Sequence, residues 1–174
     1  MRRNNGGFTL IELIVVIVIL GILAVTAAPK FIDLQSDARL ATLNGMKAAI
    51  NSAVSLTYGK SLVNGKEKEE KVSITINGSP VDVCYGYPCA AATEIQKVLD
   101  IGEFNECKES STAAGDWCYG KQTDTKKINI YIANGYSESS KCFLIYEQAK
   151  KSGTGTEEKI EPPVVKLAPS VKDC

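Results

Sequence analysis

The chain contains no histidine, which removes a whole set of reaction mechanisms from consideration. Without an imidazole there is no Ser-His-Asp or Cys-His nucleophile system, no histidine general base and no metal site of the HExxH type. The chain also has no net charge, because 20 lysine and arginine residues balance 20 aspartate and glutamate residues. It therefore has no basic excess with which to bind nucleic acid. Its 174 residues suffice for one domain with an attachment.

Charged residues are also missing from one long stretch near the amino terminus. None occurs between Glu12 and Lys30, and residues 13–28 read LIVVIVILGILAVTAA. A helix over residues 8–28 would extend about 30 Å at ~1.5 Å per residue, which is the thickness of the hydrocarbon core of a bilayer. The stretch is rich in β-branched residues, but it is too long for a single strand. We therefore expect a helix that spans a membrane.

Three details distinguish this segment from an ordinary secretory signal. A polar leader of residues 1–7, with two arginines, ends in Gly7, and the apolar run follows at once. Glu12 lies one helical turn inside that run, where a carboxylate is costly and requires an explanation. Pro29 follows the run and is expected to kink or break the helix. A signal peptide cleaved near Ala27 and a simple signal anchor are the alternatives, and neither accounts for a Gly-Phe junction followed by an acid.

The sequence Gly7-Phe8-Thr9-Leu10-Ile11-Glu12, together with the apolar run and Pro29, resembles the class III leader and spine helix of type IV pilins. The resemblance implies that a membrane prepilin peptidase cuts between Gly7 and Phe8 and methylates the new amine of Phe8. It also implies that Glu12 is the glutamate needed for assembly. Residues 27–39 and the later Tyr85-Gly86-Tyr87-Pro88 are similar, more narrowly, to the mannose-sensitive haemagglutinin pilins, whose pili attach to surfaces and glycans.

The chemistry of the expected cut is consistent with an assembly role for Glu12. Cleavage after Gly7 creates an α-amine on Phe8 that is largely cationic at neutral pH. The Glu12 carboxylate of an incoming subunit can pair with the Phe8 amine of a neighbour, and the low polarity of a bundle of apolar helices favours one register. Such a contact is head-to-tail and does not close, so it produces a helical polymer.

The residues after Pro29 predict a second, amphipathic half of the same helix. Apolar or small residues recur there at three- and four-residue steps up to about Tyr58, with Gly59 as the stop signal. They are Phe31, Leu34, Ala38, Ala41, Gly45 or Met46, Ala49, Ala53 and Leu56. Gly21 is either a packing residue or, with Pro29, a boundary of a stretch whose helix loosens in the polymer.

The rest of the chain predicts an α+β head in which an antiparallel sheet packs on the helix, as in the type IV pilin fold. Residues 72–76 and 81–85 alternate around Asn77-Gly78, which predicts a β-hairpin with Pro80 at an edge. Residues 90–99 read as a short helix, and residues 128–132 and 142–146 as a second antiparallel pair. The expected segments are a cleaved leader (1–7), a membrane and filament-core helix (8–29), an amphipathic half-helix (30–58) and a head (59–174).

The six cysteines, an even number, predict three disulfides in an exported chain. Fifteen pairings are open from sequence alone. Nearest neighbours give Cys84 with Cys89, Cys107 with Cys118, and Cys142 with Cys174, and the last resembles the carboxy-terminal disulfide loop of pilins. The alternative is a four-thiolate zinc site formed by Cys84, Cys89, Cys107 and Cys118, but neither pair has the Cys-x-x-Cys spacing of a zinc ribbon.

These features predict a structural protein with no catalytic site, cofactor or metal. By resemblance, it is the major subunit of a type IV pilus that polymerises with copies of itself, and its other partners are a prepilin peptidase, an assembly platform and an ATPase. It would reside in the bacterial inner membrane before assembly and in an extracellular pilus afterwards. A type II secretion pseudopilin, a minor pilin and a membrane-tethered periplasmic enzyme are the alternatives. Tyr85, Tyr87, Trp117 and Tyr119 are candidates for stacking on surface glycans, or equally for packing around turns and disulfides.

Overall fold

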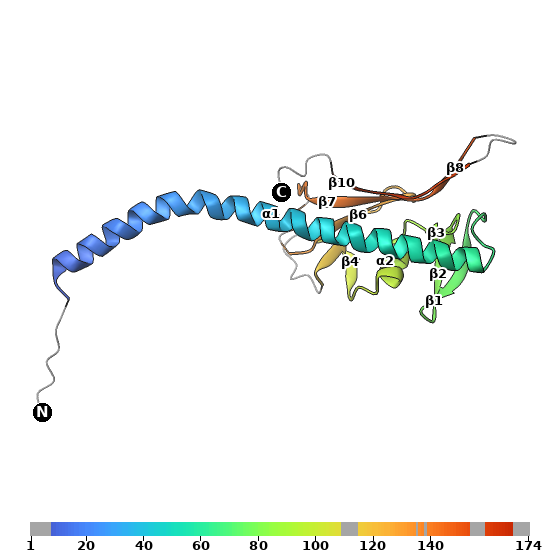
Figure 1. Cartoon of the computed structure of the whole chain (residues 1–174), viewed down its shortest axis with the longest axis horizontal. Coiled ribbons are helices and arrows are strands. Elements are labelled where there is room, and N and C mark those ends of the chain that lie inside the picture. Colours follow the sequence, from blue (N-terminus) through green and yellow to red (C-terminus); the bar gives the residue numbers. More distant parts are fainter. Residues whose placement is uncertain (1–7, 109–114, 135, 138, 154–158, 169–174) are drawn as a thin grey trace, which may run out of the picture. The chain divides into compact units, whose positions relative to one another are not determined.

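The structure of the chain is a computed structural model that describes residues 8–108, 115–134, 136–137, 139–153 and 159–168, without the side chains of residues 27–33. The chain divides into two compact units, Met1–Ala38 and Arg39–Cys174. The elements, in chain order, are α1 (Leu10–Val63), β1 (Val72–Ile76), β2 (Ser79–Cys84), β3 (Tyr87–Pro88), α2 (Ala92–Leu99), β4 (Phe104–Glu106), β5 (Trp117–Tyr119), β6 (Lys127–Ile132), β7 (Phe143–Glu147), β8 (Lys150–Ser152), β9 (Lys159–Glu161) and β10 (Val164–Leu167) (Figure 1).

Helix α1 is assigned without interruption from Leu10 to Val63. It passes through Gly21 and Pro29. The helix is therefore not interrupted at Pro29, and the loosening in the polymer that Gly21 and Pro29 were expected to bound stays a prediction. A proline removes one backbone hydrogen bond from a helix, and the bonds before and after it can hold the helical path.

The end of α1 lies one turn beyond the predicted stop, at Val63 instead of Tyr58. Gly59 is an interior residue of the helix, and Gly65, with a φ of 64°, provides the left-handed position that ends it. The N–H of Gly65 donates to the carbonyl of Leu62 at 3.0 Å, and the N–H of Lys66 donates to the carbonyl of Ser61 at 2.9 Å. These two bonds form a Schellman motif, which satisfies carbonyls that the helix end would otherwise leave unpaired.

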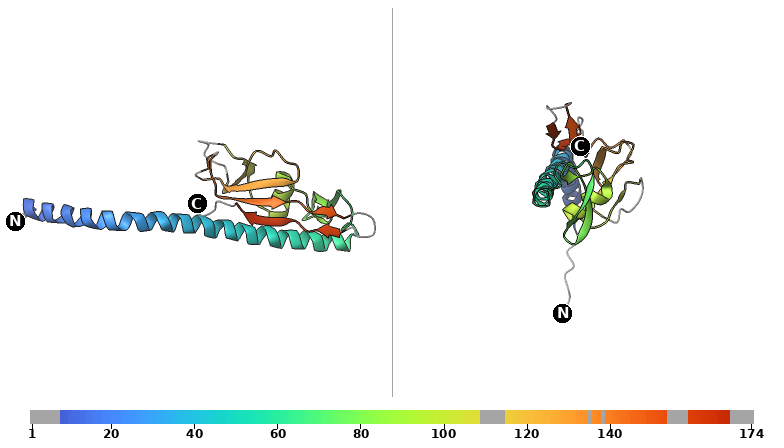
Figure 2. Two further views of the ribbon diagram at one scale, coloured as in Figure 1. Left: turned by 90° about the horizontal axis from the view of Figure 1, so that it is seen from above. Right: turned by 90° about the vertical axis from the view of Figure 1, so that its right-hand side faces the viewer.

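The strands among the described residues of the head form three sheets, and the largest lies along the second half of α1 (Figure 2, left). Its order is β10-β7-β6-β5-β4, and its β6 and β7 form the antiparallel pair predicted from residues 128–146. The predicted sheet was antiparallel throughout, but β4 and β5 are parallel.

The hairpin and the short helix were also predicted. β1 and β2 pair antiparallel around Asn77 and Gly78, whose φ angles of 50° and 79° are those of a type I′ turn. Strand β2 is central in its sheet, but β3 pairs only with its last two residues, so Pro80 has a neighbouring strand on one side alone. Strands β8 and β9 form a small separate hairpin that the sequence analysis did not predict.

The core of the head lies between α1 and the large sheet, but the face of α1 that enters it is not the predicted one. Met46 and Ala53 are buried as expected, whereas Leu34 and Leu56 are 61% and 76% exposed. The buried stripe is Leu43, Met46, Ile50, Ala53, Val54, Thr57 and Ser61. It packs on residues of β6, β7 and β10, namely Ile128, Ile130, Leu144, Tyr146 and Val165. The prediction followed alanines, which fit either face, instead of the larger aliphatic residues that fill volume.

Candidate functional site

The amino-terminal part of α1 is an apolar surface without a covering. Fourteen large apolar side chains between Phe8 and Val25 are exposed, from 45% for Ile14 to 89% for Phe8. Gly21 lies among them, and a Cβ built on it would meet nothing within 4 Å. Single exposed apolar residues are ordinary, but a continuous surface of this kind marks a site that contacts a membrane or another protein.

Within the described part of the chain, no helix is both long and apolar enough to cross a membrane.

The first turn of α1 is closed by a capping box that the sequence analysis overlooked. The backbone N–H of Thr9 and its Oγ1 hydroxyl donate to Glu12 Oε2 at 2.8 and 2.7 Å, and the N–H of Glu12 donates to Thr9 Oγ1 at 3.4 Å. The signal was in the sequence, because Thr-x-x-Glu before an apolar run is the pattern of a capping box. Glu12 thus has a local structural function besides the assembly role implied by resemblance. Gly7 lies outside the described residues, so the structure does not bear on the cut between Gly7 and Phe8.

The structure joins Cys84 to Cys89 and Cys107 to Cys118, the nearest-neighbour pairs of the sequence analysis. These four sulfurs are therefore not available as zinc ligands, and the described residues contain no other cluster that could hold a metal ion. Cys142 is also disulfide-bonded. Its expected partner, Cys174, lies outside the described residues, so this pairing stays a prediction.

The turn between Cys84 and Cys89 is held to α1 and to the large sheet. Ser61 Oγ, fully buried in the last turns of α1, donates to the carbonyl of Gly86 at 2.9 Å. The N–H of Tyr85 donates to the carbonyl of Glu69 at 2.9 Å. The Tyr146 hydroxyl in β7 donates to the carbonyl of Pro88 at 2.6 Å. We call residues 84–89 the disulfide turn; its backbone is bonded to three separate segments of the chain.

The four aromatic residues proposed as glycan contacts lie in two places, and three of them have packing roles. The Tyr87 ring stacks on Tyr58 in α1, with centroids 4.4 Å apart and planes 8° apart. Burial, together with the neighbouring Tyr58, raises the pKa of the Tyr87 hydroxyl above its ordinary value. Tyr119 meets Phe104 edge-on at 5.3 Å, and Trp117 packs against the main core from the same strand, β5. Their use by a glycan stays a prediction, and the packing alternative now has specific contacts.

The comparisons with known proteins support the resemblance of the amino-terminal segment to that of type IV pilins. Residues 2–28 match the family model of the prokaryotic N-terminal methylation motif. The chain is 50% identical over 50 residues to the type IV narrow pilus major component PilA5 of Thermus thermophilus, covering 29% of this chain and 43% of that protein. It is 34% identical over 102 residues to the type IV major pilin protein PilA of Myxococcus xanthus, covering 56% and 44%.

A secretion protein is among the relatives as well. The chain is 42% identical over 55 residues to the type II secretion system core protein G of Pseudomonas aeruginosa, covering 32% of this chain and 39% of that protein. The chain thus spans less than half the length of these relatives. No solved structure shows a significant match. The relatives are named as components of pili or of a secretion system, which fits the expectation that this chain is not an enzyme.

The methylation motif, the long amino-terminal helix and the disulfide-bonded head built on a largely antiparallel sheet lead to one conclusion. The amino-terminal segment carries the prokaryotic N-terminal methylation motif and is similar to the segments of type IV pilins and of a type II secretion core protein, and the architecture of the chain fits the type IV pilin fold.

Proposed function

We propose that this protein is a structural subunit that polymerises through α1 into a type IV pilus. The observation that carries the proposal is the exposed apolar surface from Phe8 to Val25. Burial of apolar surface contributes roughly 25 cal/mol per Å² removed from water, so burying these fourteen large side chains is strongly favourable. Before assembly these side chains contact lipid, and in a filament they contact the helices of other subunits.

In this proposal, residues 1–7 are removed and residues 8–29 lie in the inner membrane before assembly, with the head in the periplasm. The two arginines of the leader support this orientation, because positive residues favour the cytoplasmic side. The segment is proposed as a whole, and the side chains of residues 27–29 lie outside the described ones. A prepilin peptidase, an assembly platform and an ATPase are the partners that processing and extraction require.

Glu12 is proposed to select the register of the polymer by pairing with the methylated amine of Phe8 in a neighbouring subunit. Its capping box complicates the simplest test, since Glu12→Val removes the cap as well as the charge. Glu12→Gln separates the two functions, because the amide oxygen can still accept from Thr9 while the negative charge is lost. Thr9→Ala is the matched control, since it weakens the cap and keeps the carboxylate.

The measurement is the yield of filaments sheared from cells, together with the mass and first residue of the subunit in membranes and in filaments. We expect all three variants to be cut before Phe8. Glu12→Val and Glu12→Gln should give no filaments, and Thr9→Ala should give many. Normal filaments from processed Glu12→Gln would refute charge pairing, and a mature chain that begins elsewhere than at Phe8 would refute the whole proposal.

A type II secretion pseudopilin is the second candidate, and the similarity to core protein G of Pseudomonas aeruginosa favours it specifically. Both candidates use the same amino-terminal segment, so that segment does not decide between them. Deletion of the gene distinguishes the two candidates. Surface filaments should disappear if the chain is a pilin, whereas export of folded proteins across the outer membrane should stop if it is a pseudopilin.

The finer proposal is a pilus of the mannose-sensitive haemagglutinin type, used for attachment. It is supported by the resemblance of residues 27–39 and of the disulfide turn. Attachment of cells with pili of normal length should fall when Tyr85→Ala removes the one of the four aromatics for which the structure describes neither a ring contact nor packing on the main core. Unchanged attachment would remove Tyr85 from the proposed glycan contacts.

A further inference from the structure

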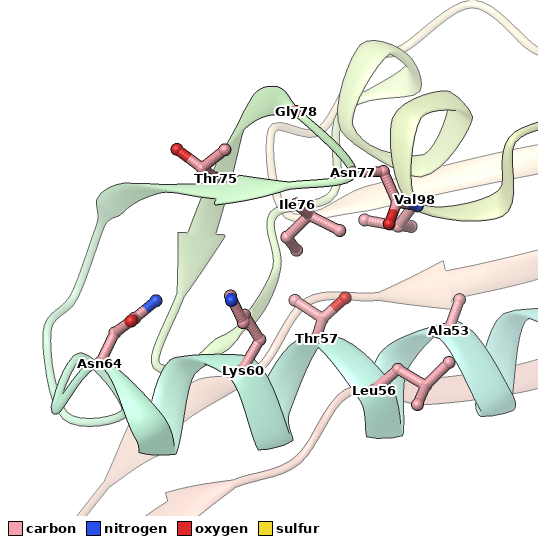
Figure 3. A pocket seen from close by; sticks show the side chains of 10 residues that line it. All are labelled: Ala53, Leu56, Thr57, Lys60, Asn64, Thr75, Ile76, Asn77, Gly78 and Val98. Carbon is pink, nitrogen blue, oxygen red and sulfur yellow. The ribbon is translucent and has the colours of Figure 1, made fainter.

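A groove of about 610 Å³ lies in the head between the last turns of α1, the β1–β2 hairpin and α2 (Figure 3). We call it the hairpin groove. Its apolar lining is Ala53, Leu56, Ile76 and Val98, and its polar lining is Thr57, Lys60, Asn64, Thr75, Asn77 and the backbone of Gly78. A concave site of this volume, with an apolar wall and a few convergent polar groups, has the build of a small-ligand site.

Four polar side chains of the groove are without a protein partner. Among the described residues, no hydrogen bond or ion pair is formed by the side chains of Lys60, Asn64, Thr75 or Asn77. Figure 3 shows Lys60 and Asn64 reaching from α1 toward the hairpin, while Asn77 points back from the turn toward the helix. The polar groups thus come from both sides of one cavity, as is expected of groups that bind a ligand lying between them.

The charge of the lining restricts the chemical class of ligand that the groove can bind. Lys60 is the one charged residue among the ten that line the groove, and no carboxylate is among them. An anionic group is therefore favoured next to Lys60. A purely apolar ligand would cover the amides and the hydroxyls and leave them without partners, which is costly. Thr75 points away from α1 in Figure 3, so the ligand needs hydroxyl groups for Asn64 and Asn77, and a less polar face for Ile76 and Val98.

We propose that the hairpin groove binds an acidic monosaccharide unit, with its carboxylate on the Lys60 ammonium and its hydroxyls on Asn64 and Asn77. A hexose ring presents carbon-bound hydrogens on one face and hydroxyls at its edge, which matches the division of the lining into an apolar wall and a polar rim. The proposal goes beyond a role in a filament and does not depend on it, since the groove lies wholly within one head.

The test uses the full chain in non-ionic detergent, with glucuronate as the probe and glucose as its neutral counterpart. Ligand-observed NMR detects binding in the millimolar range that a single sugar is expected to reach. Glucuronate should bind about tenfold more tightly than glucose, because a charge-assisted hydrogen bond replaces a neutral one. Lys60→Met should remove that preference. Lys47→Met, on the same helix and outside the groove, should keep it.

A second variant leaves Lys60 in place and so tests the proposal even if Lys60→Met disturbs the fold. Leu56 is 76% exposed at the edge of the groove, so Leu56→Glu is tolerated by the helix and brings a negative charge to the ligand. It should weaken glucuronate binding about tenfold and leave the weak binding of glucose unchanged. Equal binding of the two sugars by the natural chain would overturn the proposal, as would glucuronate binding that neither variant changes. If the variants instead abolish filaments and leave sugar binding intact, the groove is a contact between copies and the proposal is wrong.

Discussion

A methyl group added to the disulfide turn should destabilise the head far more than the same group added to the hairpin turn. Gly86 has a φ of 83°, and a Cβ built on it would lie 3.0 Å from the backbone Cα of Glu67 and 3.0 Å from the Tyr58 ring. Gly78 has nearly the same φ, 79°, but nothing lies within 4 Å of its Cβ position. The two glycines therefore share a backbone cost and differ in packing.

The expected magnitudes follow from that difference. A left-handed alanine costs about 1–2 kcal/mol at either position. At Gly86 the close contacts add about 1–3 kcal/mol, because Glu67 contributes backbone that cannot rotate away. Gly86→Ala should thus lower the free energy of unfolding about 1–3 kcal/mol more than Gly78→Ala does. Urea unfolding in non-ionic detergent, followed by the fluorescence of Trp117, the one tryptophan of the chain, measures both. Equal losses in the two variants would show that the disulfide turn is not pressed against α1 as described.

Two further predictions concern the large sheet. The hydrogen bond from Lys166 to Glu147 at 2.6 Å, helped by Lys127 at 3.4 Å, holds the pKa of the Glu147 carboxyl below its ordinary value. A carboxyl with a lowered folded pKa stabilises the fold above its unfolded pKa, and this contribution is lost as the pH falls through the folded value. The free energy of unfolding should therefore decline as the pH falls below about 5, and Glu147→Gln should reduce that decline; an unchanged slope contradicts the assignment. Tyr146→Phe removes the bond to the Pro88 carbonyl and should cost about 1 kcal/mol in urea unfolding, with the disulfides intact. No loss would mean that water replaces the hydroxyl.

Local patterns were the part of the fold that could be predicted. The hairpin at Asn77-Gly78, the helix α2 and the pairing of β6 with β7 each depend on residues close in the sequence, with a turn pair or an alternation to mark them. The parallel pairing of β4 with β5 could not be read in this way. Two strands of three residues carry almost no periodic signal, and the predicted disulfide between Cys107, directly after β4, and Cys118 in β5 does not by itself give the direction of their pairing.

The helix shows a different limit. Its existence was clear, but two faces of it are lined by apolar or small residues, and only contact with the sheet selects the face of Leu43 and Ile50. Its end was misplaced because Gly59 and Gly65 look alike in sequence, and only Gly65 has the positive φ that ends a helix.

The same distinction between local and long-range signals applies to the candidate site. The motif that contains Phe8 and Glu12 could be recognised from sequence, because the order of its residues along the chain is itself the signal, and the roles of the two residues stay predictions. The hairpin groove was not found, since its lining comes from α1, β1, the hairpin turn and α2, and no spacing connects Lys60 with Asn77 or Val98.

The first turn of α1 uses only part of the Glu12 side chain. Thr9 bonds to Oε2 alone, and among the described residues Oε1 has no hydrogen-bond partner. One oxygen thus anchors the carboxylate to its own helix, while the other accepts no hydrogen bond from the described residues. An incoming ammonium would meet a group already held in place, so docking would restrict little additional side-chain rotation and would not require the helix to give up its cap.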